Sequence, residues 1–326
     1  MGNIIVPASN TLREDVTALM LLSAILPLSI RGSYDVDDLG RTNILFTTLR
    51  AFGADQVLKE ILIVCPPDEV SVIREQVKKW PEFIIRVVSE EDMVPELANH
   101  RQVRGWRKQQ MIKLAAPREL STPYYLTLDA DAICLRPLTE SLLIPDGKAL
   151  LQYEKRALHP RWWKSSSRIL KMSDHVGDPE VGMTVTPAIM ASDISEATGE
   201  EIAANLRGKG SWVDKLCRLH NPRSPSNWTF YRHLRGRWTE YSLYYFCALK
   251  RNMLDKYHVT AGTETHPQLL LIHDSHPFEQ WVPEQSFAPN GQGLFCVVNS
   301  SMRFDIENTW QKIAPFVPGA SDLKMP

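Results

Sequence analysis

The sequence predicts an α/β fold in which a mainly parallel sheet carries helices on both faces. The first observation is that short apolar runs alternate with stretches of helical length through the first half of the chain. The second is that prolines directly follow two of these helical stretches. The third is a pair of aspartates at the end of one apolar run, because parallel sheets bind ligands at that edge. The second half is less regular, and we expect it to extend the same fold.

Four apolar runs in the first half have the length and composition of buried strands, and three stretches between them have the spacing of helices. Pro81 and Pro117 follow the second and third of these stretches. They indicate where the helices end, because a proline disfavours helical backbone at the residue before it. The predicted strands are residues 25–30, 61–65, 83–88 and 124–128, and the predicted helices are about 38–52, 67–79 and 104–116.

Residues 16–30 are the most apolar part of the N-terminal region. They are about five residues short of the ~20 that a membrane-spanning helix needs, and Pro27 interrupts them. Arg13, Glu14 and Asp15 precede the segment, where a signal peptide would carry basic residues. We predict a helical turn that leads into the first buried strand. A signal peptide or a peripheral contact with the inner membrane is the alternative.

The second half contains fewer regular elements. Residues 154–180 are rich in charge and tryptophan, and residues 221–237 contain prolines among polar residues, which predicts a loop. The predicted strands are residues 181–190 and 269–272, and the predicted helices are 195–206, 211–219 and about 240–253.

Composition and charge narrow the function classes. A chain of 326 residues with 44% hydrophobic residues can bury the core of one large domain. Its formal net charge of -1 gives no reason to expect a nucleic-acid partner. The five cysteines are odd in number, lack the spacing of a zinc site and have apolar neighbours. They predict buried thiols in a reducing compartment, and hence a cytoplasmic protein without a transmembrane segment.

The strongest chemical signal is the pair Asp129 and Asp131, which directly follows the apolar run at 124–128. If the strand continued, alternation would place both side chains on the same face. Two carboxylates that close repel each other unless a cation neutralises them. Mg²⁺ or Mn²⁺ prefers such oxygen ligands together with substrate phosphates. The alternative is a loop with two solvated aspartates.

The predicted helix at 104–116 begins with three basic residues, Arg104, Arg107 and Lys108. Basic groups oppose the dipole of a helix at its first turn, and this placement becomes favourable if an anion such as a diphosphate binds nearby. Gln110 and Lys113 lie within one turn of each other on the same helix. The alternative is a solvated basic face.

Two segments, "GWRKQQMIKLAA" and "YYLTLDADAICLRPL", make the chain similar to a bacterial family of DxD-containing transferases within the GT-A superfamily. The resemblance extends from "ILPLSI" through "TEYSLYYFC" to "LLIHDSHP". It implies a glycosyltransferase, such as a hexosyltransferase, with a Rossmann-type donor half at 1–150 and an acceptor half at 151–326. The implied partners are a nucleotide-sugar donor and a glycan, lipid-linked or small-molecule acceptor, with Mn²⁺ or Mg²⁺ as the cofactor.

The resemblance also implies roles for individual residues. In many retaining GT-A enzymes a late histidine completes the metal site, and His273 is similarly placed after the apolar run at 269–272. His276 is the competing candidate for that role. The expected metal ligands are therefore Asp129, Asp131 and His273, and the expected donor-binding residues are Arg41, Arg104, Trp106, Gln110, Lys113 and Asp129.

Glu240 is the candidate catalytic residue. A carboxylate beside the anomeric carbon of the donor could deprotonate the acceptor hydroxyl or stabilise positive charge on the sugar. The alternative is structural, since Thr239 can cap the following helix and Glu240 would then lie at its positive end. Rings and basic groups in the irregular segments suit an acceptor site, for which we name Trp162, Trp163 and Arg232.

Two other enzyme classes use paired aspartates to bind metal. A phosphatase of the haloacid dehalogenase type places the motif at its first strand, whereas here it follows the fourth predicted strand. A nucleotidyltransferase would share the fold, but its Gly-rich, Lys-containing phosphate loop is not found near the N-terminus. Both remain alternatives, and the nucleotide, the sugar and the stereochemistry of transfer stay open.

Overall fold

The computed structural model describes residues 21–31, 36–183, 185–220, 236–273, 275, 277–298 and 305–320. Its centre is a five-stranded sheet with the order β3-β2-β1-β4-β9. The first four strands run parallel, and β9 pairs with β4 in the antiparallel direction. The prediction of an α/β fold with a mainly parallel sheet is thereby confirmed. The strands are β1 (Leu22–Pro27), β2 (Leu58–Cys65), β3 (Ile85–Ser89), β4 (Tyr124–Thr127) and β9 (Ala188–Ala191).

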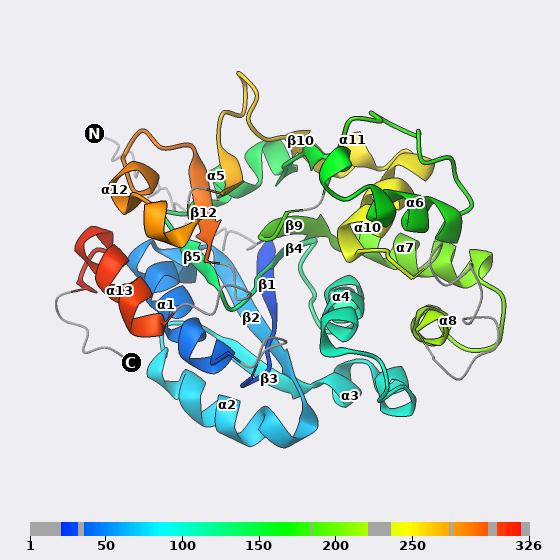
Figure 1. Cartoon of the computed structure of the whole chain (residues 1–326), viewed down its shortest axis with the longest axis horizontal. Coiled ribbons are helices and arrows are strands. Elements are labelled where there is room, and N and C mark those ends of the chain that lie inside the picture. Colours follow the sequence, from blue (N-terminus) through cyan, green and yellow to red (C-terminus); the bar gives the residue numbers. More distant parts are fainter. Residues whose placement is uncertain are drawn as a thin grey trace, which may run out of the picture.

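Helices cover both faces of this sheet (Figure 1). Helices α1 (Asp38–Ala51) and α2 (Val70–Gln76) lie on one side, and α4 (Gly105–Ala115) lies on the other. All six residues of β1 are buried, as expected for a strand with helices on both faces. The later helices α6 (Pro160–Ile169), α7 (Ser192–Asn205) and α10 (Glu240–Lys250) pack together, and both α7 and α10 contact α4.

A smaller three-stranded sheet continues directly from the aspartate pair. Its order is β11-β12-β5, with β11 parallel to β12 and β5 antiparallel to it. Helix α13 (Ile306–Ile313) packs against α1 beside this sheet, and apolar side chains from both enter a second core cluster. The strands are β5 (Ala132–Cys134), β11 (Leu269–Ile272) and β12 (Gly293–Val297).

The remaining elements are short. Strand β6 pairs with β10, and β7 pairs with β8. Their bounds, with those of the short helices, are β6 (Ala149–Leu151), β7 (Glu154–Lys155), β8 (Val181–Gly182), β10 (His258–Thr260), α3 (Glu90–Met93), α5 (Glu140–Leu143), α8 (Trp212–Leu219), α11 (Leu254–Tyr257) and α12 (Pro283–Ser286). Within the described ranges, no helix has the length and apolar character needed to cross a membrane.

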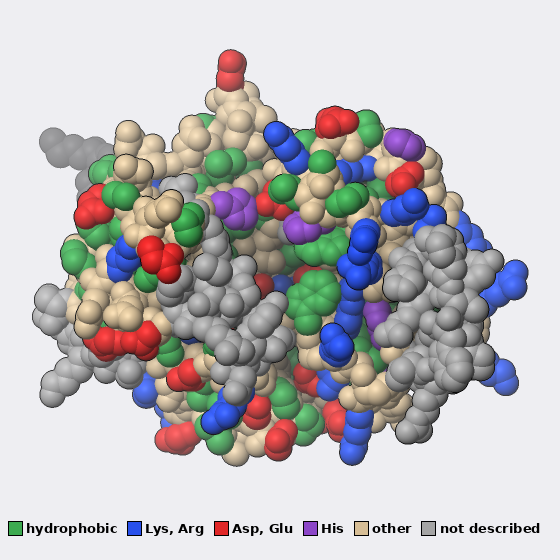
Figure 2. Space-filling model, in the orientation of Figure 1, with side chains coloured by type: hydrophobic (Ala, Val, Ile, Leu, Met, Phe, Trp, Pro, Cys, Tyr) green, Lys and Arg blue, Asp and Glu red, His purple; other side chains and the backbone are tan. Residues whose placement is uncertain are grey.

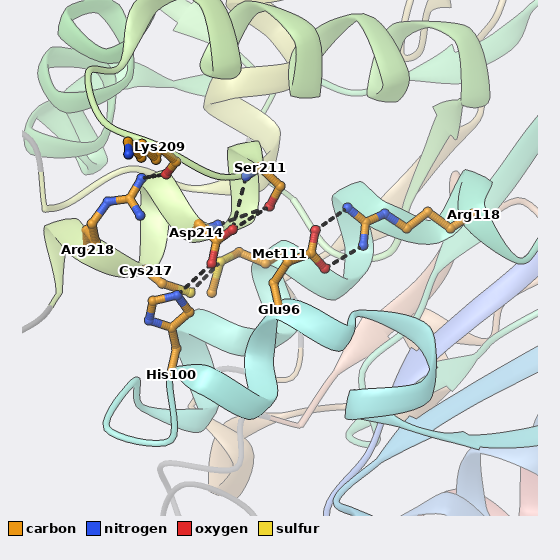
Figure 3. A network of polar contacts seen from close by, with 9 residues as sticks. All are labelled: Glu96, His100, Met111, Arg118, Lys209, Ser211, Asp214, Cys217 and Arg218. Carbon is orange, nitrogen blue, oxygen red and sulfur yellow. Dashed lines mark hydrogen bonds and ion pairs between the residues drawn. The ribbon is translucent and has the colours of Figure 1, made fainter.

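A polar network fastens α8 to the segment that leads into α4 (Figure 3). Asp214 and Ser211 form a capping box at the start of α8, which satisfies backbone N–H groups that a helix leaves free. The Asp214 carboxylate also lies 2.9 Å from Nε2 of His100. Nearby, Glu96 accepts two hydrogen bonds from Arg118, at 2.8 and 2.9 Å. The network therefore joins the segment before α4 to α8 through His100, and to the turn after α4 through Glu96 and Arg118.

Several predicted boundaries need correction. The segment at 181–190 is not one strand, because β8 and β9 belong to different sheets and the peptide bond Thr186–Pro187 between them is cis. Pro187 has no N–H to donate to a ladder, which explains why the strand does not run through it. The first strand covers 22–27 rather than 25–30, in register with both of its neighbours. Residues 16–20 lie outside the described ranges.

Other predicted boundaries shift by a few residues. Helix α7 begins at 192 instead of 195. Helix α10 ends at 250 instead of 253, and Asn252 beyond it has a positive φ of 54°. The helix predicted at 67–79 is α2 with a short 3-10 turn at each end. The five cysteines are free and buried, which confirms the prediction of buried thiols.

The buried imidazole of His258 should make the stability of this fold depend on pH. Nε2 lies 2.7 Å from the hydroxyl of Tyr244, and Nδ1 lies 3.2 Å from the carbonyl of Ala149. A carbonyl can only accept, so Nδ1 carries a proton, and the hydroxyl of Tyr244 can donate to Nε2 when the ring is neutral. Burial lowers the pKa of His258 to about 4 from an ordinary value of 6.5.

Because the unfolded chain binds the extra proton first, the free energy of unfolding should fall as the pH drops from 6.5 to 4, by about 3 kcal/mol at most. His258→Leu should remove this part of the pH dependence, whatever it does to stability at pH 7. Denaturant unfolding between pH 4 and 7 measures how the free energy of unfolding changes with pH in the wild type and in the variant. Equal slopes in the two proteins would contradict the assignment of the effect to His258.

Candidate functional site

The paired aspartates lie on a turn between the two sheets. The N–H of Leu128 donates to the carbonyl of Ile25 at 2.9 Å, which keeps the chain beside β1 just past the end of β4. The chain then turns, with the N–H of Ala132 donating to the carbonyl of Asp129 at 3.1 Å. The carbonyl of Asp131 accepts from Val298 at 3.1 Å, next to β12. The strand does not continue through the pair, and both aspartates are half-buried on the turn.

Lys113 joins two carboxylates at the floor of this region. Its Nζ lies 2.8 Å from Oδ1 of Asp129 and 3.5 Å from Oε1 of Glu240. The side chains of Lys113 and Glu240 are 4% and 5% exposed, whereas that of Asp129 is 39% exposed. We call Lys113, Asp129 and Glu240 the Lys113 cluster. The cluster connects the last turn of α4, the end of β4 and the first turn of α10.

Burial and charge act in opposite directions within the Lys113 cluster. Burial disfavours the ammonium of Lys113, but the charges around it, Asp129 first, outweigh that effect and hold the pKa of Lys113 well above its usual value. For Glu240, burial outweighs the attraction of Lys113, so the pKa of this carboxyl is raised. Lys113 is therefore a fixed positive charge, and Asp129 is its closest partner.

Tyrosine hydroxyls hold the elements of the cluster in place. The hydroxyl of Tyr241 lies 2.8 Å from Oγ1 of Thr127 and 2.8 Å from Oγ1 of Thr186. The hydroxyl of Tyr125 donates to the carbonyl of Lys113 at 2.9 Å, and lies 2.6 Å from Oγ of Ser195. These buried contacts fix α4, α7 and α10 against β4, so the cluster has little freedom to move.

A pocket opens on the other side of the aspartate turn, between α1, α13 and the smaller sheet. Arg41 and Asp131 are its charged lining residues. Arg41 is 7% exposed, and its Nη1 lies 3.4 Å from Asp38. Its Nη2 is buried without a hydrogen-bond partner among the described residues. A buried guanidinium with an unused donor suits an anionic or hydroxyl-bearing ligand.

Asp38 is a residue of this region that the sequence analysis did not single out. It lies in the first turn of α1, directly after Asp37, which caps that helix by accepting from the N–H of Gly40. Burial raises the pKa of Asp38 to about 6, Arg41 opposes the rise, and the charge of Asp129 adds to it. Asp38 and Asp129 are therefore close enough to interact. Its position in the helix that follows the first strand is the sequence signal that could have identified it.

The predicted donor-binding residues of α4 separate into buried and exposed ones. Gln110 is buried, accepts a hydrogen bond from Arg107 at 3.1 Å, and has no partner for Nε2 within the described part of the chain. Trp106 is 43% exposed, and Arg104 is exposed at the N-cap of the helix. Arg104 and Trp106 therefore face solvent at the beginning of α4, two turns or more from Lys113.

The two predicted acceptor-binding residues that the structure describes, Trp162 and Trp163, have different surroundings. The ring of Trp162 lies 6.4 Å from that of Trp106, so a residue expected at the acceptor meets one expected at the donor. Trp163 is 3% exposed and packs edge-on against Phe246 in the core, where its ring cannot stack on an acceptor. We therefore exclude Trp163 from the site. Arg232 lies outside the described residues, as does most of the loop predicted at 221–237.

His273 follows β11 near the same edge. The ladder pairs Ile272 with Cys296 and Cys296 with Ile133, so His273 lies two strands from the aspartate turn, about 10 Å away by strand spacing. Its side chain is exposed, and its Nε2 lies 2.8 Å from Oε1 of Glu154. In the part of the chain that is described, no three His, Cys, Asp or Glu side chains lie close enough to hold a metal ion. His276 lies outside that part.

The donor set at the turn fits a hard divalent cation. Two carboxylates offer oxygen ligands on a half-buried turn, and both Mg²⁺ and Mn²⁺ accept one or two carboxylates with the rest from water and phosphate. Oδ1 of Asp129 accepts a hydrogen bond from Lys113, and its Oδ2 is then the oxygen that can bind a metal ion. Figure 2 shows the face hollowed at its centre, with Lys and Arg side chains along the border of the hollow over α4.

Removing the charge of Lys113 tests the cluster. Lys113→Met leaves Asp129 and Glu240 close together without a cation, and loss of one partner of a buried pair costs about 3–5 kcal/mol of unfolding free energy. Adding Glu240→Gln should recover about 1 kcal/mol or more, because one of the two acids is then neutral. Denaturant unfolding of the wild type, the two single variants and the double variant, all in chelator, gives the free energy of interaction between the two side chains. Strictly additive effects would show that the two side chains do not interact.

Three solved structures superpose on most or much of the chain at low identity. Mouse xyloside xylosyltransferase 1, in its apo form, has a TM-score of 0.47 at 10% identity, over 87% of this chain and 100% of that one. The galactosyltransferase LgtC, with donor and acceptor sugar analogues, has a TM-score of 0.39 at 10% identity, over 93% and 96%. Glucosyl-3-phosphoglycerate synthase from Mycobacterium tuberculosis, with Mn²⁺, UDP and phosphoglyceric acid, has a TM-score of 0.31 at 15% identity, over 62% and 64%.

Likenesses at 10–15% identity do not assign an activity to this chain. No curated protein matches the chain significantly. A family profile, described as "Family of unknown function (DUF6492)", matches residues 19–321, which is nearly the whole chain. The chain belongs to this family of unknown function.

Proposed function

We propose that this protein is a metal-dependent glycosyltransferase that takes a sugar from a nucleoside-diphosphate sugar. The observation that carries the proposal is the half-buried turn with Asp129 and Asp131, which has Lys113 on one side and Arg41 on the other. It lies past the carboxyl end of a parallel strand, where α/β sheets build ligand sites. The two carboxylates can bind a metal ion, and the buried positive charges beside them can bind an anion. This combination suits a diphosphate that carries a divalent metal ion.

Each side chain then has a defined task toward the donor. Asp129 and Asp131 would hold Mn²⁺ or Mg²⁺, with water and phosphate as the remaining ligands. His273 is left out of this set, because its Nε2 contacts Glu154 instead. When bound, the cation neutralises negative charge on the diphosphate as it leaves the sugar. Lys113 orients Asp129 through its 2.8 Å contact, and the free Nη2 of Arg41 donates to the donor from the adjoining pocket. The sugar is a hexose in the proposal, and the acceptor is a glycan, lipid-linked or small-molecule hydroxyl.

Glu240 is proposed as the group that receives the acceptor proton. It is linked to the metal ligands through Lys113, and its raised pKa makes it a better base than an ordinary glutamate. In the transfer, the bond from the anomeric carbon to the diphosphate oxygen breaks, with its electron pair going to the diphosphate. A bond from the same carbon to the acceptor oxygen forms, and the hydroxyl proton goes to Glu240.

Asp131→Ala tests the metal site. Asp131 is half-buried at the turn, so its loss should leave folding nearly intact while it abolishes metal-dependent binding of a nucleoside diphosphate. Calorimetry with UDP, GDP and CDP, each with Mn²⁺ or with chelator, measures this dependence. Asp255→Ala, at an exposed position of α11, is the matched control and should bind like the wild type. Equal affinity of the wild-type protein with and without chelator would refute the metal assignment.

Glu240→Gln tests the chemical step separately. We expect turnover to fall by about 100-fold or more, as for loss of a general base, with metal-dependent donor binding within about twofold of the wild type. Donor hydrolysis and transfer are followed with the nucleotide sugar that binds best. A proportional loss of binding and turnover would instead indicate that Glu240 acts only by holding Lys113. Exchange of pyrophosphate into the nucleotide would favour a nucleotidyltransferase.

A further inference from the structure

Basic residues are concentrated in two segments that meet beside the proposed catalytic residue. Residues 97–118 contain six Lys or Arg and no Asp or Glu, and residues 155–173 contain another six with no acid. The whole chain has a net charge of only -1, and Lys108, Lys113 and Arg118 are paired with carboxylates of other segments, so the local excess comes from the remaining basic residues. The first segment includes α4 and the second includes α6. A concentration of one charge beside a ligand site raises the local concentration of the opposite charge.

Two tryptophans join the beginnings of these helices at the surface. The ring of Trp106 on α4 lies 6.4 Å from that of Trp162 on α6. Trp162 is stacked on its other neighbour, His159, at 3.7 Å with an interplanar angle of 13°. Trp106 remains 43% exposed, and it is one of few large apolar side chains that face solvent within the described residues. An exposed indole held by neighbouring rings offers a flat surface for a sugar ring.

Arg107 connects this pair to the stretch that precedes Glu240. Its guanidinium lies 4.5 Å from the ring of Trp106 and 5.1 Å from that of Trp238. It donates to the carbonyls of Gly236, at 2.7 Å, and Trp238. Glu240 follows Trp238 by two residues, so Arg107 fixes the tryptophan surface close to the proposed base.

Several exposed cations of this surface lack acidic partners. Burial lowers the pKa of Arg107 to about 10, the charge of Glu240 opposes that fall, and the charge of Arg237 adds to it. The backbone N–H of Arg237 donates to Oγ of Ser165 on α6, at 3.1 Å. Four exposed cations have no carboxylate within ion-pair distance among the described residues, and they are Arg104, Arg161, Lys164 and Arg237.

We propose that the acceptor of this transferase is an anionic saccharide. Its ring lies on Trp106 and Trp162, and its phosphate or carboxylate is held by Arg237 and the basic residues of α6. We call Trp106, Trp162, Arg104, Arg161, Lys164 and Arg237 the basic–aromatic rim. This inference rests on the proposed function, because it assigns the acceptor of the same site. The acceptor contributes a hydroxyl oxygen to the new glycosidic bond, and its anionic group takes no part in the chemistry.

Two features favour an acceptor over the donor diphosphate as the anion on the rim. The proposed diphosphate site is at the Asp129 turn, where Lys113 and Arg41 already supply positive charge. The rim lies at the opposite end of α4 from Lys113, and it is joined to Glu240 through Trp238. A hydroxyl beside Glu240 thus belongs to a molecule whose remaining part extends over the rim.

Binding of sugar pairs that differ only in charge tests the proposal. The probes are hexose 6-phosphates and hexuronates, each with its neutral methyl hexoside, and inorganic phosphate, titrated by calorimetry into the full chain with nucleoside diphosphate and Mn²⁺. We expect the anionic member of a pair to bind at least 10-fold more tightly. Arg237→Gln should remove about 10-fold of that affinity and leave the neutral sugar unchanged, as expected for one charge-assisted contact. Trp106→Ala should weaken both.

Lys79→Gln is the matched control, since it removes one positive charge from an exposed position directly after α2. Figure 1 shows α2 away from α4 and α6. Lys79→Gln should change none of the affinities, and Arg237→Gln should leave binding of the nucleoside diphosphate unchanged. Equal affinity for anionic and neutral sugars, or no binding of either, overturns the proposal. The proposal is also overturned if inorganic phosphate binds as tightly as a sugar phosphate and its affinity is unchanged in Trp106→Ala.

Two further outcomes separate the rim from its alternatives. Loss of nucleoside-diphosphate affinity in Arg237→Gln would assign the rim to the donor and overturn the acceptor proposal. Tight binding to vesicles of acidic phospholipid, with no discrimination among the sugars, would make the rim a membrane surface and overturn it as well. Absent binding of every nucleoside diphosphate, with preserved selectivity for anionic sugars, would refute the transferase proposal and support the rim.

Discussion

The ion pair between Lys113 and Asp129 is the interaction on which the rest of the site depends. An ammonium that is 4% exposed requires a partner, because the cost of removing a charge from water is recovered only through close opposite charge. Asp129 supplies that charge from the end of β4, and Glu240 supplies it from the start of α10. One side chain therefore determines how three separate parts of the chain approach each other.

The same ion pair has a consequence for chemistry. Because Lys113 occupies one oxygen of Asp129, the aspartate is oriented before any ligand arrives, and pre-oriented groups lose less freedom when they bind. Glu240 is held by the same ammonium, although burial raises its pKa. The two carboxyl groups thus differ in environment, because Asp129 is partly exposed and Glu240 is buried. This difference suits Asp129 to bind a metal ion and Glu240 to accept a proton.

Much of the first half could be predicted from the sequence because local patterns determine it. The apolar runs near 61–65 and 124–128 are strands, and the helices near 38–52 and 104–116 are α1 and α4, with shifts of a few residues. A fully buried parallel strand leaves a continuous apolar run, and a proline leaves a clear end. The prediction failed at 181–190, where Pro187 separates two strands that pair in different sheets. Pairing partners far away in the chain are not visible in a local pattern.

The sequence by itself determined that two aspartates follow a buried strand, and that basic residues crowd the start of α4, because residue types and spacing carry that information. It did not determine that Lys113 forms ion pairs with Asp129 and Glu240, or that Asp38 lies near Asp129. Nor did it determine that Trp163 is buried in the core while the ring of Trp162 contacts that of Trp106. These facts depend on how α1, α4, α6 and α10 pack around the sheet. Packing is decided by contacts between residues far apart in the chain, and only the tertiary structure brings those residues together.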